Sequence, residues 1–175
     1  MKLLIIDVDY LSNREGEPVI RLYGKKVGTA DEGKDVILHA KNFEAYCYAN
    51  VEWSAKEDIE KALGTYIKRI ELVKRYQPIG YQTDKSEMIK IVLHNPKSTP
   101  ECRRILEEMD IQVMETDIQF KNRFLNDTGI TGMSVISFNQ IGKELKNYSN
   151  LNCNEMYIID YKEIILTKDV INIEY

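Results

Sequence analysis

The stretches AYCYANV (residues 45–51) and MIKIVL (residues 88–93) decide the fold that this sequence predicts. In the first, small residues alternate with Tyr46 and Tyr48, which places both rings on one face of a strand. The second is apolar and β-branched apart from Lys90 and predicts another strand. The residues around these two strands then indicate which kind of sheet they belong to.

Helix signals lie between and after the two strands. Ser54-Ala55-Lys56-Glu57 has the spacing of a capping box, and an apolar stripe on one helical face follows it. Residues 67–76 alternate as a strand. Thr99-Pro100 predicts a second helix, with Thr99 as its N-cap, and residues 111–114 supply a last strand. This order predicts a ferredoxin-like, RRM-like β-α-β-β-α-β unit over residues 45–116, with both helices on one sheet face.

Strands are also expected on either side of this unit. Three strand-like runs predict a small antiparallel meander over residues 1–44, at 3–10, 19–23 and 35–40. A short helix within residues 119–128 is ended by Gly129, which suits a left-handed cap. Beyond it we expect a helix at 141–148 and strands at 133–138, 156–160 and 163–166. The result is an α+β chain with one domain at 1–132 and a C-terminal extension at 133–175.

Composition limits the class of protein. The chain has 175 residues, of which 43% are hydrophobic and 30% charged, as in a globular domain. No apolar run is long enough for a membrane span. The apolar run within residues 1–7 is too short for a signal peptide, and acidic residues follow it directly. We therefore expect a cytoplasmic location. The net charge of −4 argues mildly against nucleic-acid binding, although local patches decide such contacts.

Catalytic and metal-binding patterns are weak in this sequence. The three cysteines and two histidines are too scattered for a disulfide framework or a zinc site. Asp7 and Asp9 share a strand face without a third ligand at readable spacing. Asp160 and Glu163 are three residues apart, so on a strand they point to opposite faces. With no phosphate loop either, we expect no cofactor and no catalysis from this chain alone.

Two groups of side chains suit contact with nucleic acid. Tyr46 and Tyr48, with Lys90 on the later strand, predict a base-stacking surface with a cationic flank. The alternative is that these tyrosines pack against the neighbouring meander. Phe120 and Arg123 lie three apart on one helical face, where the arginine can stack on a ring or bind phosphate. The alternative is a buried phenylalanine beside a solvated arginine.

The same segments resemble those of archaeal family B DNA polymerases, in order and at similar spacing, from Leu3 to Gly132. The similar segments are Asp7-Val8-Asp9-Tyr10 with residues 16–23, Phe43-Glu44-Ala45-Tyr46-Cys47-Tyr48-Ala49, Ile91-Val92-Leu93-His94-Asn95-Pro96, Asp117-Ile118-Gln119-Phe120-Lys121-Asn122-Arg123-Phe124-Leu125 and Asp127-Thr128-Gly129-Ile130. Each motif is weak alone, whereas the ordered set is specific.

The resemblance implies the polymerase's N-terminal domain, which lies against the single-stranded template and, in archaeal members, captures template uracil. By position, the implied base pocket consists of Tyr10, Ala45, Tyr46, Met88, Asp117, Ile118, Phe120 and Arg123. Tyr46 and Phe120 would flank a base, Arg123 would bind phosphate or brace the pocket, and Tyr10 would line it. Backbone amides near Asp117 and Ile118 would read a base edge.

Several positions depart from the family pattern. Ala45 and Gln119 stand where the family has proline, and Met88 replaces the small valine that leaves room for uracil. After Met133 the acid pair of the first exonuclease strand is missing, so residues 133–175 read as a degenerate or truncated start of that region. Magnesium would belong to the polymerase and exonuclease domains.

The implied partners are single-stranded template DNA and the remaining polymerase domains or subunit. The alternative is a noncatalytic protein-docking module, or a stand-alone subunit of a split polymerase.

Overall fold

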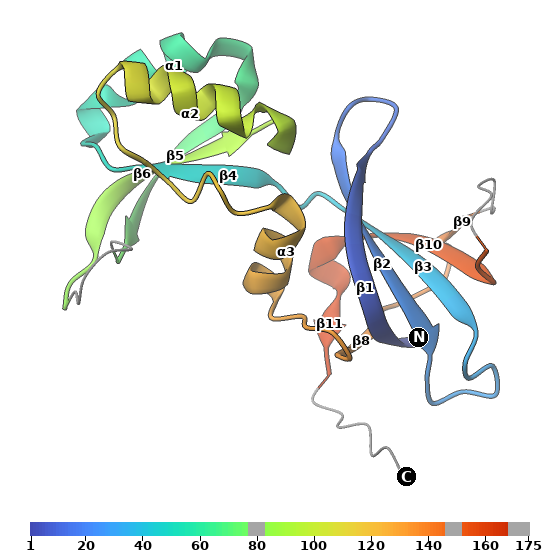
Figure 1. Ribbon diagram of the computed structural model, residues 1–175. Coiled ribbons are helices and arrows are strands. Elements are labelled where there is room, and N and C mark those ends of the chain that lie inside the picture. The colour runs from blue at the N-terminus through green and yellow to red at the C-terminus, as the bar shows by residue number, and fades with distance from the viewer. Residues whose placement is uncertain (77–82, 146–151, 168–175) are drawn as a thin grey trace. The chain divides into compact units, whose positions relative to one another are not determined.

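The computed structural model describes residues 1–76, 83–145 and 152–167 and divides into two compact units. The inserted unit comprises Glu44–Ile118. The discontinuous unit comprises Met1–Phe43 together with Gln119–Tyr175. The mixed α+β class expected from the sequence is confirmed, with one sheet in each unit and few helices (Figure 1).

The inserted unit follows the predicted β-α-β-β-α-β order. Its main elements are β4 (Ala45–Ala49), α1 (Lys56–Leu63), β5 (Ile67–Arg75), β6 (Ser86–Leu93), α2 (Thr99–Glu108) and β7 (Val113–Met114), with short 3₁₀ turns η1 (Trp53–Ala55), η2 (Gly64–Tyr66) and η3 (Pro96–Ser98). The strands pair antiparallel in the order β5-β6-β4-β7. Figure 1 shows α1 and α2 on one face of this sheet, so neither of the helices described in this unit covers the other, which we call the helix-free face.

Helix starts in the inserted unit differ from the sequence prediction. The capping box at Ser54 does not form, because Ser54 lies inside η1 and α1 begins at Lys56 without a side-chain cap. Thr99 is the first residue of α2, not its N-cap, and its hydroxyl donates to the Pro96 carbonyl at 2.8 Å. Asn95 caps η3 instead. In both places a 3₁₀ turn comes first and moves the cap position.

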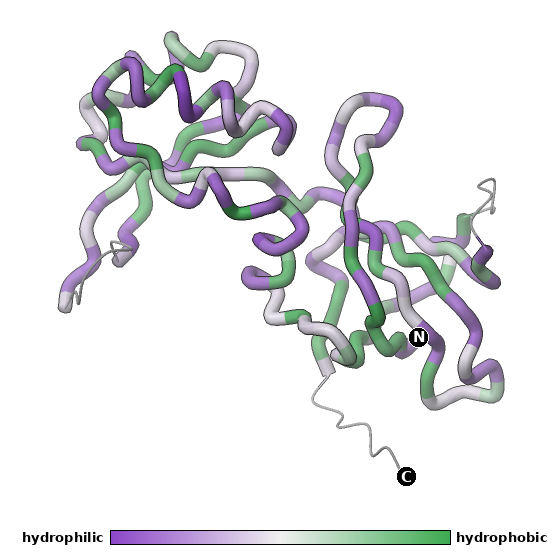
Figure 2. Tube along the Cα trace, viewed as in Figure 1, coloured by the Kyte–Doolittle hydropathy of each residue, from purple (hydrophilic) through white to green (hydrophobic). Residues whose placement is uncertain are grey.

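The discontinuous unit contains a seven-stranded sheet in the order β11-β8-β1-β2-β3-β10-β9. Its elements are β1 (Lys2–Ser12), β2 (Pro18–Lys26), β3 (Asp35–Lys41), α3 (Phe120–Thr128), β8 (Val135–Ser137), β9 (Glu144–Leu145), β10 (Glu155–Asp160), η4 (Tyr161–Glu163) and β11 (Ile165–Leu166). The meander β1-β2-β3 is antiparallel, as expected, whereas β10 pairs with β3 in parallel. Hydrophobic residues gather at the start of β1 and hydrophilic ones at its hairpin end (Figure 2).

The C-terminal segment differs most from the sequence prediction. Strands β8 to β11 all join the sheet of β1, β2 and β3, so the described part of residues 133–175 completes that sheet. The helix predicted at 141–148 is wrong where it is described, because residues 144–145 form β9; residues 146–148 lie outside the described residues. The last predicted strand shortens to Ile165–Leu166, because Glu163 ends η4.

Close packing in the discontinuous unit depends on small and aromatic residues. A Cβ on Gly24 of β2 would lie 2.6 Å from the Leu4 carbonyl oxygen of β1, so only glycine fits there. Phe43 is the centre of an aromatic cluster, with its ring 5.4 Å from Phe120, 5.2 Å from Phe124 and 5.3 Å from Tyr161. Gly129 ends α3 with φ at 72°, the predicted left-handed cap.

Candidate nucleic-acid interface

The helix-free face of the inserted unit is defined by strand register. Paired residues of antiparallel strands share a face, so Tyr48 of β4 lies beside Lys90 of β6 and Met114 of β7, and Lys90 lies beside Glu71 of β5. Tyr48, Met88 and Met114 form a buried apolar cluster, and Tyr46 packs against it half-buried. This face therefore carries an aromatic and methionine-rich centre.

Cations lie over both tyrosine rings of this face. The Tyr46 and Tyr48 rings meet edge to face, with centroids 5.5 Å apart. The Lys90 ammonium lies 4.3 Å from the Tyr46 centroid, and the Arg75 guanidinium lies 5.5 Å from that of Tyr48. The predicted grouping of Tyr46, Tyr48 and Lys90 is thus present. Aromatic rings flanked by cations are the combination that stacks bases and holds phosphates in single-strand binders.

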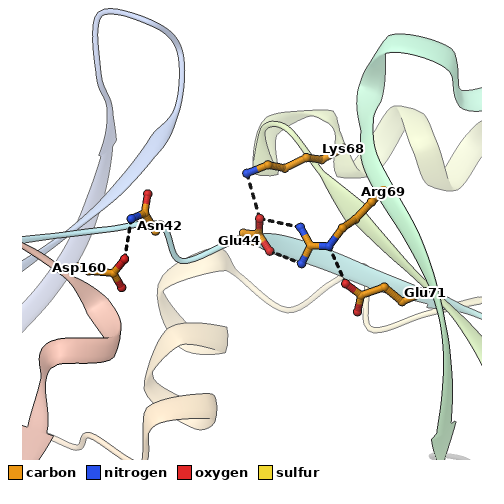
Figure 3. A network of polar contacts seen from close by, with 6 residues as sticks. All are labelled: Asn42, Glu44, Lys68, Arg69, Glu71 and Asp160. Carbon is orange, nitrogen blue, oxygen red and sulfur yellow. Dashed lines mark hydrogen bonds and ion pairs between the residues drawn. The ribbon is translucent and has the colours of Figure 1, made fainter.

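Acidic residues fix the cations at the β5 edge of the same face. Arg69 donates to both carboxylate oxygens of Glu44, at 2.7 and 2.5 Å, and to Glu71 at 2.6 Å, while Lys68 pairs with Glu44 at 2.9 Å (Figure 3). The Arg69 hydrogen bonds hold the pKa of Glu44 down at about 2, against the opposing effect of partial burial. The Glu71 carboxylate also lies 3.9 Å from the Lys90 ammonium. Arg69 is therefore occupied, which leaves Lys90 and Arg75 as the cations beside the rings.

The predicted pocket residues of the inserted unit fall on different surfaces. Ala45 is buried and points to the sheet face opposite Tyr46, because neighbours on a strand alternate. Met88 is buried in one cluster with Tyr48 and Met114. Asp117 is exposed and Ile118 half-buried, in the segment after β7. Of these residues, the structure brings only Tyr46 and Met88 to the helix-free face.

The predicted residues of the discontinuous unit lie in its core. Phe120 is buried, with its ring 5.2 Å from Tyr10, which is half-buried in β1. Arg123 is only 4% exposed, so the interpretation of a solvated arginine is wrong. Tyr46 and Phe120 belong to different units, and their flanking of one base therefore stays a prediction.

The acids considered as metal ligands have structural partners. Asp9 accepts hydrogen bonds from Arg21 at 2.8 and 2.6 Å and from the Tyr23 hydroxyl at 3.0 Å. Asp160 and Glu163 form the two halves of a capping box on η4. Within residues 1–76, 83–145 and 152–167, no group of three His, Cys, Asp or Glu side chains is placed to hold a metal, and no helix is long and apolar enough to cross a bilayer.

Sequence reasoning missed Arg75 and Met114 as parts of this face. The signal for Arg75 was present, because Arg69, Glu71, Val73 and Arg75 alternate along one face of β5. Met114 lies in a strand of two residues, where alternation carries little information. The bonded pairs of strands were needed to place both residues beside Tyr48.

Comparisons with known proteins point to one enzyme family. No protein-family model matches the chain. It is 32% identical over 142 residues to a DNA polymerase of Thermococcus gorgonarius, which spans 74% of this chain and 17% of the polymerase. DNA polymerase 1 of Pyrococcus abyssi is 29% identical over 136 residues, again 74% of this chain and 17% of the relative.

A solved structure shares the fold. The family B DNA polymerase of Pyrobaculum calidifontis matches with a TM-score of 0.77 at 20% identity, covering 97% of this chain and 21% of that one. The chain spans less than a quarter of the length of each of these three polymerases.

Proposed function

We infer that this chain, whose homologues are the archaeal family B DNA polymerases, binds single-stranded template DNA on the helix-free face of its inserted unit. It does so as a noncatalytic domain, in the manner of the N-terminal region of a polymerase. The rest of the polymerase, in the same chain or another, would supply nucleotidyl transfer and its magnesium. The single observation that carries the proposal is Lys90 lying 4.3 Å from the Tyr46 ring on a sheet face without helices.

The chemistry of that face supports a single strand as the ligand. Each base has an aromatic surface, so stacking on Tyr46 accepts any sequence, as a template reader requires. Lys90 can reach a phosphate from its place beside the ring. The net charge of −4 weakens long-range attraction, but it is spread over the whole chain, whereas the contact depends on the local cations.

The proposal is tested by binding of a fluorescent oligothymidylate to the full chain across a salt series. Replacing the ring by a similar apolar volume, Tyr46→Leu, should weaken binding about 5- to 150-fold, the cost of one lost stacking contact. Lys90→Gln should lower the salt dependence by about 0.7 in the slope of log affinity against log salt, the value of one phosphate contact.

Matched controls lie away from this face. Tyr66→Leu changes a tyrosine in η2, and Lys61→Gln changes an exposed lysine of α1. Both should bind as the wild type does. Equal loss in the controls, or no binding by the wild type at low salt, would reject the proposal. A salt-insensitive affinity for a protein partner would then favour the docking module.

The family resemblance also predicts uracil capture, which is more specific than single-strand binding. The helix-free face offers Tyr46 for it, but Met88 fills the position of the smaller family residue and is buried against Tyr48 and Met114. A pair of oligonucleotides that differ by one uracil or thymine tests this point. Tighter binding of the uracil strand would support a sensing pocket, and equal binding would leave a general template-strand domain.

A further inference from the structure

A pocket of about 160 Å³ opens at the end of the sheet in the inserted unit where β5 ends and β6 begins. Its wall consists of Tyr48, Arg75, Tyr76, Met88, Met114 and Glu115. All six residues belong to β4, β5, β6, β7 or the residue directly after β5 or β7. We call Tyr46, Tyr48 and Lys90 the Tyr46 platform, and the pocket continues from it because Tyr48 belongs to both.

The wall suits a flat aromatic ligand. Met88 and Met114 supply soft, polarizable surface next to Tyr48. The Tyr76 ring is 55% exposed and has the Lys85 ammonium 5.4 Å from its centroid, and the Arg75 guanidinium lies over Tyr48. Arg75 in the wall and Lys85 over Tyr76 supply two cations for the phosphates on either side of a nucleotide.

Glu115 favours a ligand that donates a hydrogen bond to this pocket. It is the acidic residue of the wall and follows directly after β7. Its backbone has φ at 61°, a left-handed conformation that is unfavourable for a non-glycine residue and is common at functional sites. An ionised carboxylate only accepts hydrogen bonds, so beside the C4 substituent of a pyrimidine it favours the amino group of cytosine and disfavours the carbonyl oxygen of uracil or thymine.

We propose that this pocket is a nucleotide subsite selective for a base with an exocyclic amino group, with cytosine preferred over uracil or thymine. Glu115 accepts the hydrogen bond from the amino group, Tyr48 and Tyr76 contact the base, and Arg75 holds an adjacent phosphate. The inference rests on the proposed function, because a single strand on the Tyr46 platform delivers the base. It adds a base preference to the sequence-tolerant stacking on Tyr46.

The experiment compares two oligothymidylates that carry one central cytosine or one central uracil, bound to the full chain. These two bases differ at C4, where cytosine has an amino group and uracil a carbonyl oxygen, and at N3, which carries a proton only in uracil. The wild type should bind the cytosine strand about fivefold more tightly, the value of one discriminating contact. Glu115→Gln should bind both strands equally, since an amide both donates and accepts. The matched control Glu57→Gln, on exposed α1 sequence, should keep the preference.

A second variant tests the pocket at an exposed residue, where a substitution should not disturb folding. Tyr76→Ala removes an exposed ring and should reduce the cytosine preference without lowering the melting temperature. Equal binding of both strands by the wild type, or a preference that survives in Glu115→Gln, would overturn the subsite while single-strand binding stands. If neither strand binds, the proposed function fails and the subsite fails with it. Tyr46→Leu separates the two roles, because it should weaken both strands equally.

Discussion

Phe124→Ala should lower the free energy of unfolding by about 3–5 kcal/mol, the range for truncating a buried phenylalanine. The Phe124 side chain is 0% exposed in α3, and its ring meets Phe43 edge to face at 5.2 Å. Truncation leaves a cavity in the cluster that joins the helix to the chain before β4. Because Phe43 also contacts Phe120 and Tyr161, the cavity has rigid aromatic walls that cannot close around it.

Urea unfolding followed by tyrosine fluorescence and circular dichroism measures this loss. The control is Asn126→Ala, an exposed position on the same helix, which should change stability by less than about 0.5 kcal/mol. A Phe124→Ala midpoint within the error of the control would show that the aromatic cluster does not stabilise the discontinuous unit.

Glu155→Gln should cost about 3 kcal/mol, because it leaves a buried ammonium group without its close partner. Lys26 is only 7% exposed at the end of β2, and its ammonium lies 2.6 Å from Glu155 of β10 and 3.9 Å from Asp31. Lys26→Met should cost less, since Glu155 reaches solvent and keeps the hydrogen bond from the Tyr157 hydroxyl.

The same pair makes stability depend on pH in a defined direction. Burial alone would raise the pKa of Glu155, but hydrogen bonds from Lys26 and Tyr157 outweigh it and lower the pKa below the ordinary 4.5. A lowered pKa contributes stability above pH 4.5, which is lost as the pH falls through the folded value. The difference in unfolding free energy between wild type and Glu155→Gln should therefore shrink below pH 4.5. A difference that grows on acidification would contradict the assignment.

The inserted unit was predictable from sequence because its signals are local. The alternation in AYCYANV and MIKIVL fixes which residues share a face, and turns and helices of ordinary length separate the strands. Lys90 was placed with Tyr46 and Tyr48 for this reason, and the structure confirms it at 4.3 Å from the Tyr46 ring. Arg75 was not predicted as part of this face. Its neighbour Tyr48 lies two strands away, and the sequence does not give the register in which β5, β6 and β4 pair.

In the discontinuous unit the elements up to α3 and the strands β8 and β10 were predictable, whereas the pairing of β10 was not. β10 pairs with β3 over more than a hundred residues of intervening chain, and no local pattern encodes that partner. Ile141 and Leu145 are four apart and mimic one face of a helix. In the structure Ile141 is 79% exposed and Gly142 adopts φ of 70°, so a turn and the short strand β9 replace the helix.

The base pocket of eight residues was predicted from the family resemblance alone, and in the structure its residues differ in burial and in the surface on which they lie. The burial of Arg123 changes how it is tested, because Arg123→Ala would remove a buried charge and disturb folding together with any binding. Tyr46 and Lys90 are better probes, since both are only half-buried. Their alternation on the strands also separates them from the helix-facing core residues Ala45 and Ile91.

Backbone amide shifts during titration with oligothymidylate test the central claim most directly, because they locate the ligand on one face of the inserted unit. We expect the largest shifts at Tyr46, Tyr48 and Lys90 on β4 and β6, with the exposed residues of α1 and α2 unchanged. Shifts confined to the two helices, or none at a low salt concentration, would contradict a template-binding surface on the helix-free face.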